Sequence, residues 1–146
     1  DIDLSDLHRR IRLFDVPIKL KREHRTMIHK HIKKLSIKKN VRQDGNIEVI
    51  LRGRNTQDQE IHQEMGNDKN FWQVNIPLHI SKKEITTTCI YINNECEYLS
   101  CEPGEWFIMR GDLWHHGSKV NSISKDAIHI RYHPIMAIVS IYFKSY

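Results

Sequence analysis

Residues 103–117 read Pro-Gly-Glu-Trp-Phe-Ile-Met-Arg-Gly-Asp-Leu-Trp-His-His-Gly. The Pro-Gly pair is a turn signal, and the apolar-rich run that follows it is typical of a strand. A second short turn then leads to two adjacent histidines, His115 and His116. In a small β-barrel, this arrangement places an imidazole at the mouth of the barrel, where it can face a metal ion. The stretch therefore predicts a barrel strand with one metal ligand, and the other ligands must come from elsewhere in the chain.

The second half of the chain consists of short strand-like segments with no helical interruption. One amphipathic helix is predicted over residues 21–39, because apolar side chains recur there at steps of three and four. About eight strands follow at regular spacing, a pattern typical of an antiparallel sandwich or barrel. The predicted strands are residues 46–51, Phe71–Ile80, 84–92, 95–101, 105–110, 114–120, 127–133 and 136–143.

The 146 residues are enough for one domain with a single core. We expect one domain over residues 1–146, with a helical flank at 1–45 and a β core at 46–146. Within the flank, residues 1–13 could form a short helix that leads into an edge strand.

The positive charge is concentrated in the first part of the chain, where residues 1–54 hold 15 of the 23 Lys and Arg. Lysines at helical spacing in residues 30–34 favour the solvated face of a helix. Because no helix-turn-helix, zinc-finger or aromatic-stacking pattern accompanies the charge, a nucleic-acid partner is not expected. No apolar run approaches the roughly 18 residues needed to span a bilayer, so a membrane role is not expected either.

The three cysteines, Cys89, Cys96 and Cys101, are an odd number without CxxC spacing. This pattern argues against a disulfide framework and against a structural zinc site. We expect three buried free thiols and a reducing, cytoplasmic location.

His62 and Glu64 have the spacing of a metal-ligand pair. A mononuclear non-haem iron site needs two imidazoles and one carboxylate on one face of the metal. Side chains at positions i and i+2 leave a strand on the same side, so a His-x-Glu pair and a distant histidine can supply such a set. His115 or His116 is the candidate for the distant ligand, and the pattern alone leaves both open.

Residues 71–133 resemble the double-stranded β-helix of the aspartyl/asparaginyl β-hydroxylase family, and in particular its free-proline hydroxylase branch. The resemblance rests on motifs that occur in the same order and at nearly the same spacing. These are Ile76-Pro77-Leu78 at a strand end, the Asn93-Asn94 hairpin, Tyr98, Pro103-Gly104-Glu105, His115, Asn121 and Ile128-His129-Ile130. The resemblance implies a mainly β, jelly-roll or cupin-like fold with an N-terminal helical flank.

The same resemblance implies that His62, Glu64 and either His115 or His116 bind Fe(II). Counting forward from Gly104 favours His115, whereas counting back from the later strand favours His116. The family usually has Asp, or no carboxylate, where this chain has Glu64.

The co-substrate implied by the family is 2-oxoglutarate, used together with O2. Its far carboxylate needs a cation, and the family supplies an arginine just before the segment that matches Ile128-His129-Ile130. Here Ala127 holds that place, which leaves Arg131 or Lys125 as the substitute. The family's second arginine and a nearby histidine correspond to Gln73 and Asn75, polar residues on one strand face that is expected to point inward.

Two functions of different classes follow from these patterns. The first is an Fe(II)- and 2-oxoglutarate-dependent dioxygenase that hydroxylates an aliphatic carbon of an amino acid or peptidyl residue, with Arg52 and Trp114 as candidate substrate contacts. The second is a non-catalytic, cupin-like binding or structural domain. The oligomeric state is left open by the sequence.

Overall fold

The computed structural model describes residues 8–12, 21–45, 47–53, 56–80, 88–119 and 136–146. Its elements are β1 (His8–Arg12), α1 (Arg22–Leu35), β2 (Val41–Gln43), β3 (Glu48–Arg52), β4 (Phe71–Ile80), β5 (Thr88–Ile92), β6 (Glu95–Leu99), β7 (Phe107–Arg110), β8 (His115–Gly117) and β9 (Met136–Ser145). The predicted segment 127–133 lies outside the described residues.

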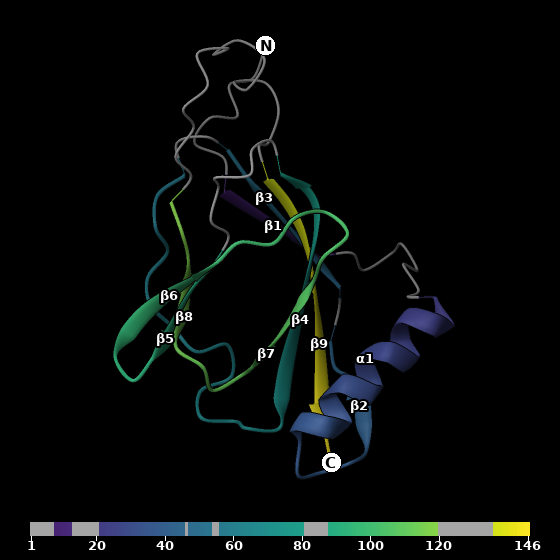
Figure 1. Cartoon of the computed structure of the whole chain (residues 1–146). Helices are drawn as coiled ribbons and strands as arrows, with labels where there is room; N and C mark the ends of the chain where they lie inside the picture. Colours follow the sequence, from purple (N-terminus) through teal and green to yellow (C-terminus); the bar gives the residue numbers. More distant parts are fainter. Residues whose placement is uncertain (1–7, 13–20, 46, 54–55, 81–87, 120–135) are drawn as a thin grey trace.

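Two antiparallel sheets form the body of the molecule (Figure 1). The larger sheet has the order β1-β3-β9-β4-β7, and β2 also pairs with β9. The smaller sheet has the order β6-β5-β8. Strands β1 and β2 belong to the larger sheet, so the N-terminal flank contributes strands as well as the helix.

Helix α1 covers one face of the larger sheet (Figure 1). Its buried side chains Ile28 and Ile32 are four residues apart and therefore lie on one helix face. They pack with Trp72 and Val74 of β4 and with Ile141 and Phe143 of β9. Each such aliphatic side chain contributes about 1.5–3 kcal/mol by its burial. The exposed side chains of Lys30, Lys33 and Lys34 form the solvated helix face that the sequence predicts.

The helix ends at Leu35 rather than at the predicted Lys39. Ser36 has extended backbone angles, and its buried hydroxyl donates to the Ser145 hydroxyl of β9 at 2.8 Å. The Lys39 ammonium then donates to the carbonyls of Lys33 and Ser36, which satisfies groups that the last helical turn leaves unpaired.

The alternation along β4 and β9 separates two environments. Trp72 and Val74 face the helix, whereas Gln73 and Asn75 belong to the opposite face, where Ser140 of β9 hydrogen-bonds to both. Period two along a strand explains this division. The polar face of β4 therefore points away from the helix.

The predicted hairpin at Asn93-Asn94 is present between β5 and β6. Ile92 pairs with Glu95, so the loop has two residues, and both asparagines have positive φ angles of 52° and 64°. Asparagine tolerates this left-handed region better than most residues, which explains its use in such two-residue turns.

None of the described helices is long and apolar enough to cross a membrane.

Candidate metal centre

The segment that carries His62 and Glu64 runs antiparallel to the segment that carries His115. The Gln59 amide donates to the Gly117 carbonyl at 3.0 Å, and the Met65 amide donates to the Gly111 carbonyl at 3.4 Å. Between these links, His62 and His115 form an isolated antiparallel bridge. Two segments far apart in sequence are thus held in register by their backbones.

Three side chains converge at this bridge. Glu64 Oε1 lies 3.3 Å from His62 Nε2 and 3.4 Å from His115 Nε2. The two imidazole rings have centroids 4.4 Å apart. One ligand atom from each of the three residues lies within 4.8 Å of the other two. The sequence-predicted set His62, Glu64 and His115 is therefore brought together in space.

The backbone orients both imidazoles in the same way. His62 Nδ1 lies 2.7 Å from the Glu60 carbonyl, and His115 Nδ1 lies 2.9 Å from the Leu113 carbonyl. Since a carbonyl only accepts, each Nδ1 carries the proton, and Nε2 of a neutral ring presents a lone pair. Two Nε2 lone pairs and a carboxylate oxygen then face one another, which requires a proton or a cation between them. Histidines that bind a metal through Nε2 commonly donate their Nδ1–H to a backbone carbonyl in this way.

The spacing of the ligand atoms fits a divalent metal. Nitrogen and oxygen ligands lie about 2.0–2.2 Å from such an ion, so two ligands at right angles are separated by about 3 Å. Two histidines and one carboxylate on one face of the metal are the ligand set of non-haem iron oxygenases. The residues present therefore fit an iron ion, with the longer Glu64 in place of the usual aspartate.

Glu64 is ionised by its surroundings even though it is largely buried. Burial opposes the charge, but the hydrogen bond formed when a proton lies between Glu64 and His115 Nε2, together with the nearby positive charge of Arg10, outweighs it and holds the pKa of Glu64 below its ordinary value. Arg10 also forms an ion pair with Glu48 at 3.2 Å. Sequence reasoning did not identify Arg10, because its position in strand β1 had no recognisable motif.

Gln63 links the segment that carries His62 and Glu64, here called the ligand segment, to the turn before His115. Its side-chain amide donates to the Asp112 carbonyl at 2.7 Å and to Asn67 Oδ1 at 3.1 Å. This residue was also missed, since a glutamine between two ligand positions carries no signal in the sequence.

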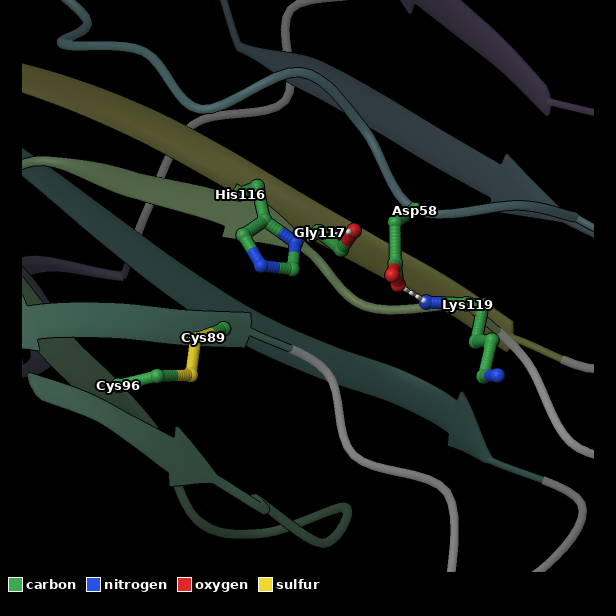
Figure 2. The surroundings of a disulfide bond; sticks show 6 residues. All are labelled: Asp58, Cys89, Cys96, His116, Gly117 and Lys119. Carbon is green, nitrogen blue, oxygen red and sulfur yellow. Dashed lines mark hydrogen bonds between the residues drawn. A yellow bond between two sulfur atoms is a disulfide. The ribbon is translucent and has the colours of Figure 1, made fainter.

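His116 points to the other side of β8 from His115. In Figure 2 its ring lies on the side of the Cys89–Cys96 disulfide. Its ring centroid lies 5.8 Å from that of Tyr91. Adjacent residues of a strand leave it on opposite faces, so only one of the two histidines can join His62 and Glu64. The geometry favours His115.

The expectation of three buried free thiols is wrong. Cys89 and Cys96 are joined as a disulfide, Cys96 is exposed, and only Cys101 is a buried free cysteine. Cys96 pairs across the hairpin with Tyr91, two residues from Cys89. The two cysteines are thus diagonal neighbours on one face of the hairpin, where long or polarisable side chains can meet.

A cavity adjoins Glu64 and His115 and is bounded by the polar face of the larger sheet. Gln73 and Asn75, the predicted contacts of 2-oxoglutarate, both line it, and Gln73 Nε2 donates to Asn75 Oδ1 at 3.2 Å. Gln73 Oε1 is buried and has no hydrogen-bond partner within the described residues. These two residues thus offer polar atoms to the cavity but no charge.

The remaining predicted contacts fall in different places. Arg52 is buried and lines the cavity. Trp114 is 51% exposed and precedes His115 in the chain. Arg131 and Lys125, the proposed partners of 2-oxoglutarate, lie outside the described residues, as do Asn121 and the segment 128–130.

No family model matches the chain, and no curated protein matches it. Several solved structures do match the chain. AviO1 from Streptomyces viridochromogenes Tue57 is 8% identical over 86% of this chain and 58% of its own, with a TM-score of 0.64. SnoK, a non-heme alpha ketoglutarate dependent carbocyclase from nogalamycin biosynthesis, is 11% identical over 84% of this chain and 59% of its own, with a TM-score of 0.58.

A third neighbour is SnoN, a non-heme alpha ketoglutarate dependent epimerase from the same biosynthesis. It is 9% identical over 84% of this chain and 58% of its own, with a TM-score of 0.56. The chain thus spans less than two thirds of each of these proteins. At such identities the likeness concerns the fold alone, which is the mainly β, double-stranded β-helix that the sequence predicts. Membership of the aspartyl/asparaginyl β-hydroxylase family stays a prediction.

Proposed function

We propose that this chain is a non-haem Fe(II)- and 2-oxoglutarate-dependent oxygenase. His62 Nε2, Glu64 and His115 Nε2 would hold the iron. The observation that carries the proposal is the convergence of these three ligand atoms within 4.8 Å, with each Nδ1 bound to a backbone carbonyl. The fold likeness to two enzymes described as non-heme and alpha ketoglutarate dependent supports it.

When bound, the iron supplies the redox chemistry by which 2-oxoglutarate and O2 become succinate and CO2 while a substrate C–H bond is oxidised. The protein's own part is to fix the three ligands on one face of the metal and leave the opposite face open. His115 is buried beside the cavity, so a ligand bound in the cavity would lie next to this imidazole.

For the substrate we propose an amino acid or a peptidyl residue with an aliphatic carbon to be hydroxylated, as the sequence resemblance implies. Trp114, half-exposed beside His115, is a candidate for contact with it. Because the structural neighbours include a carbocyclase and an epimerase, the assay should follow 2-oxoglutarate rather than one hydroxylated product.

The test is anaerobic addition of Fe(II) and 2-oxoglutarate, followed by absorption in the visible region. A weak charge-transfer band from the chelate is expected in the wild type and should disappear in His62→Ala and His115→Ala. On admission of O2, the wild type should form succinate, faster with a suitable amino acid or peptide present.

A non-catalytic, cupin-like domain predicts a different result. It gives no chelate band and no O2-dependent succinate, even if the protein binds a metal. That outcome, or a band that persists in both histidine variants, would refute the oxygenase proposal.

A further inference from the structure

Arg52 at the end of β3 is a buried cation that is only partly hydrogen-bonded. Its side chain is 2% exposed. Nη2 donates to the Gln57 carbonyl at 2.9 Å. Nε and Nη1 are both buried and have no hydrogen-bond partner in the part of the chain that the structure describes.

No described carboxylate is hydrogen-bonded to this guanidinium. The charge of Asp58 acts on it favourably, but Asp58 Oδ1 accepts a hydrogen bond from the Lys119 amide (Figure 2). Burial lowers the pKa of Arg52 to about 10, so the guanidinium remains charged at neutral pH. Burying a charge without a bonded counter-ion costs free energy. We therefore expect this guanidinium to bind an anion.

The position of Arg52 says where that partner would lie. Arg52 lines the same cavity as Glu64 and His115. Its Nη1 also lies close to Gly117, since a Cβ placed on Gly117 would be 3.1 Å from it. Gly117 follows His115 by two residues in β8. The unpaired guanidinium atoms and the ligand histidine thus belong to one small site.

Other cations that line the cavity among the described residues are less available. Arg10 is engaged with the Glu48 carboxylate at 3.2 Å. His8 Nε2 lies 3.1 Å from Gln59 Nε2, and burial together with the charges of Arg52 and Arg10 lowers the pKa of His8, which favours the neutral ring. Arg52 is therefore the cation best placed to receive an anion.

We propose that Arg52 binds a carboxylate group of a ligand in this cavity, beside His115 and Glu64. Guanidinium–carboxylate pairs are charge-assisted and directional, which suits a fixed ligand orientation. The carboxylate has two possible sources, the far end of 2-oxoglutarate or the substrate. The choice between them rests on the proposed function, whereas the carboxylate site itself does not.

The first arm of the test uses metal-free protein and glutarate as the probe. Calorimetry would compare the wild type, Arg52→Met, Arg52→Lys and the control Arg9→Met, with chloride at matched ionic strength. Arg9 is exposed and adjacent to Arg10 in β1, so its loss removes the same charge from the surface. We expect glutarate binding in the wild type and Arg9→Met, weaker binding in Arg52→Lys, and none in Arg52→Met.

Thermal unfolding shows whether the variants remain folded. Because Arg52→Met removes a desolvated charge with unpaired atoms, its unliganded form should be as stable as the wild type or more stable. Loss of binding in a folded variant then reports on the site itself.

The second arm uses Mn(II)-loaded protein under anaerobic conditions. It compares 2-oxoglutarate with 2-oxopentanoate, which has a methyl group in place of the far carboxylate. If Arg52 binds that carboxylate, Arg52→Met should weaken 2-oxoglutarate binding by roughly 10- to 100-fold and leave 2-oxopentanoate unchanged. If the variant keeps the preference for 2-oxoglutarate but loses glutarate binding, Arg52 serves the substrate.

The outcomes separate this inference from the proposed function. If the protein binds glutarate through Arg52 but binds no metal, the oxygenase proposal is refuted and the proposal of a carboxylate site stands. If Arg52→Met matches the wild type in both arms, the carboxylate site is wrong whatever the metal does.

Discussion

His62 and His115 exchange both of their backbone hydrogen bonds, each 2.9 Å from nitrogen to oxygen. This pairing places their side chains on the same side of the bridge, where Glu64 lies between the two Nε2 atoms. The relative position of the two imidazoles is therefore set by the backbone rather than by side-chain packing alone. The backbone thus holds the three candidate ligands close together, which lowers the cost of ordering them around an ion.

Gln63 should tune the metal site without being a ligand. Gln63→Ala removes its hydrogen bond to the Asp112 carbonyl and loosens the ligand segment. We expect metal affinity to fall about 10-fold, the lower end for loss of a supporting contact. Titration with Mn(II), followed by electron paramagnetic resonance, measures it. Asn67→Ala removes only the exposed partner of Gln63 and should bind like the wild type; equal affinities in all three proteins would argue against the supporting role.

The helix-facing core should affect stability but not the site. Ile32→Ala leaves a cavity under α1 and should lower the free energy of unfolding by about 2–5 kcal/mol. Leu35→Ala, at a side chain that is 64% exposed, should change it by less than about 0.5 kcal/mol. Urea unfolding checks both values. Metal affinity should be unchanged in folded Ile32→Ala, because His62, Glu64 and His115 lie outside the core that α1 forms with the larger sheet.

Alanine substitutions at Gly111, near the site, and at Gly104, away from it, should affect metal binding differently. A Cβ on Gly111 would lie 2.7 and 2.9 Å from side-chain atoms of Phe71, so Gly111→Ala should cost about 1–3 kcal/mol by overpacking. It should also weaken metal binding, since the Gly111 carbonyl accepts from Met65 at the end of the ligand segment. Gly104 has a φ of 96° and open space around it, so Gly104→Ala is strained but should leave metal affinity intact. Urea unfolding and metal titration of both variants test this; a metal affinity lowered equally in the two would contradict it.

Thiol titration tests for the Cys89–Cys96 disulfide. Denatured but unreduced protein should show one reactive thiol, that of Cys101, and reduced protein should show three. Reduction should lower stability by about 2–3 kcal/mol on the chain-entropy estimate for so short a loop. Three thiols before reduction would restore the expectation of free cysteines.

The sequence anticipated the parts of this molecule that depend on local patterns. Period-two alternation predicted β4 with its observed bounds, Phe71–Ile80, and the Asn93-Asn94 pair predicted the two-residue hairpin. The His-x-Glu spacing and the strand-turn-histidine pattern pointed to the three residues that converge. Each of these signals lies within a few residues of chain.

The features that were missed depend on contacts between distant segments. The polar stretch around Gln59 and Met65 looks like a loop, and only its backbone links to Gly117 and Gly111 give it a strand-like course. The unpaired atoms of Arg52 likewise result from its burial, which no spacing predicts. The disulfide was foreseeable in part, because a two-residue turn at positions 93–94 places Cys89 and Cys96 diagonally across the hairpin.

The most direct test of the metal centre compares two adjacent histidines. Mn(II) or Fe(II) would be titrated anaerobically into folded wild type, His115→Ala and His116→Ala, with circular dichroism as the check on folding. We predict one ion per chain in the wild type, affinity within about 3-fold of it in His116→Ala, and a loss of more than about 100-fold in His115→Ala. If His116→Ala abolishes binding while His115→Ala retains it, or if the wild type binds no ion, the metal centre assigned to His62, Glu64 and His115 is wrong.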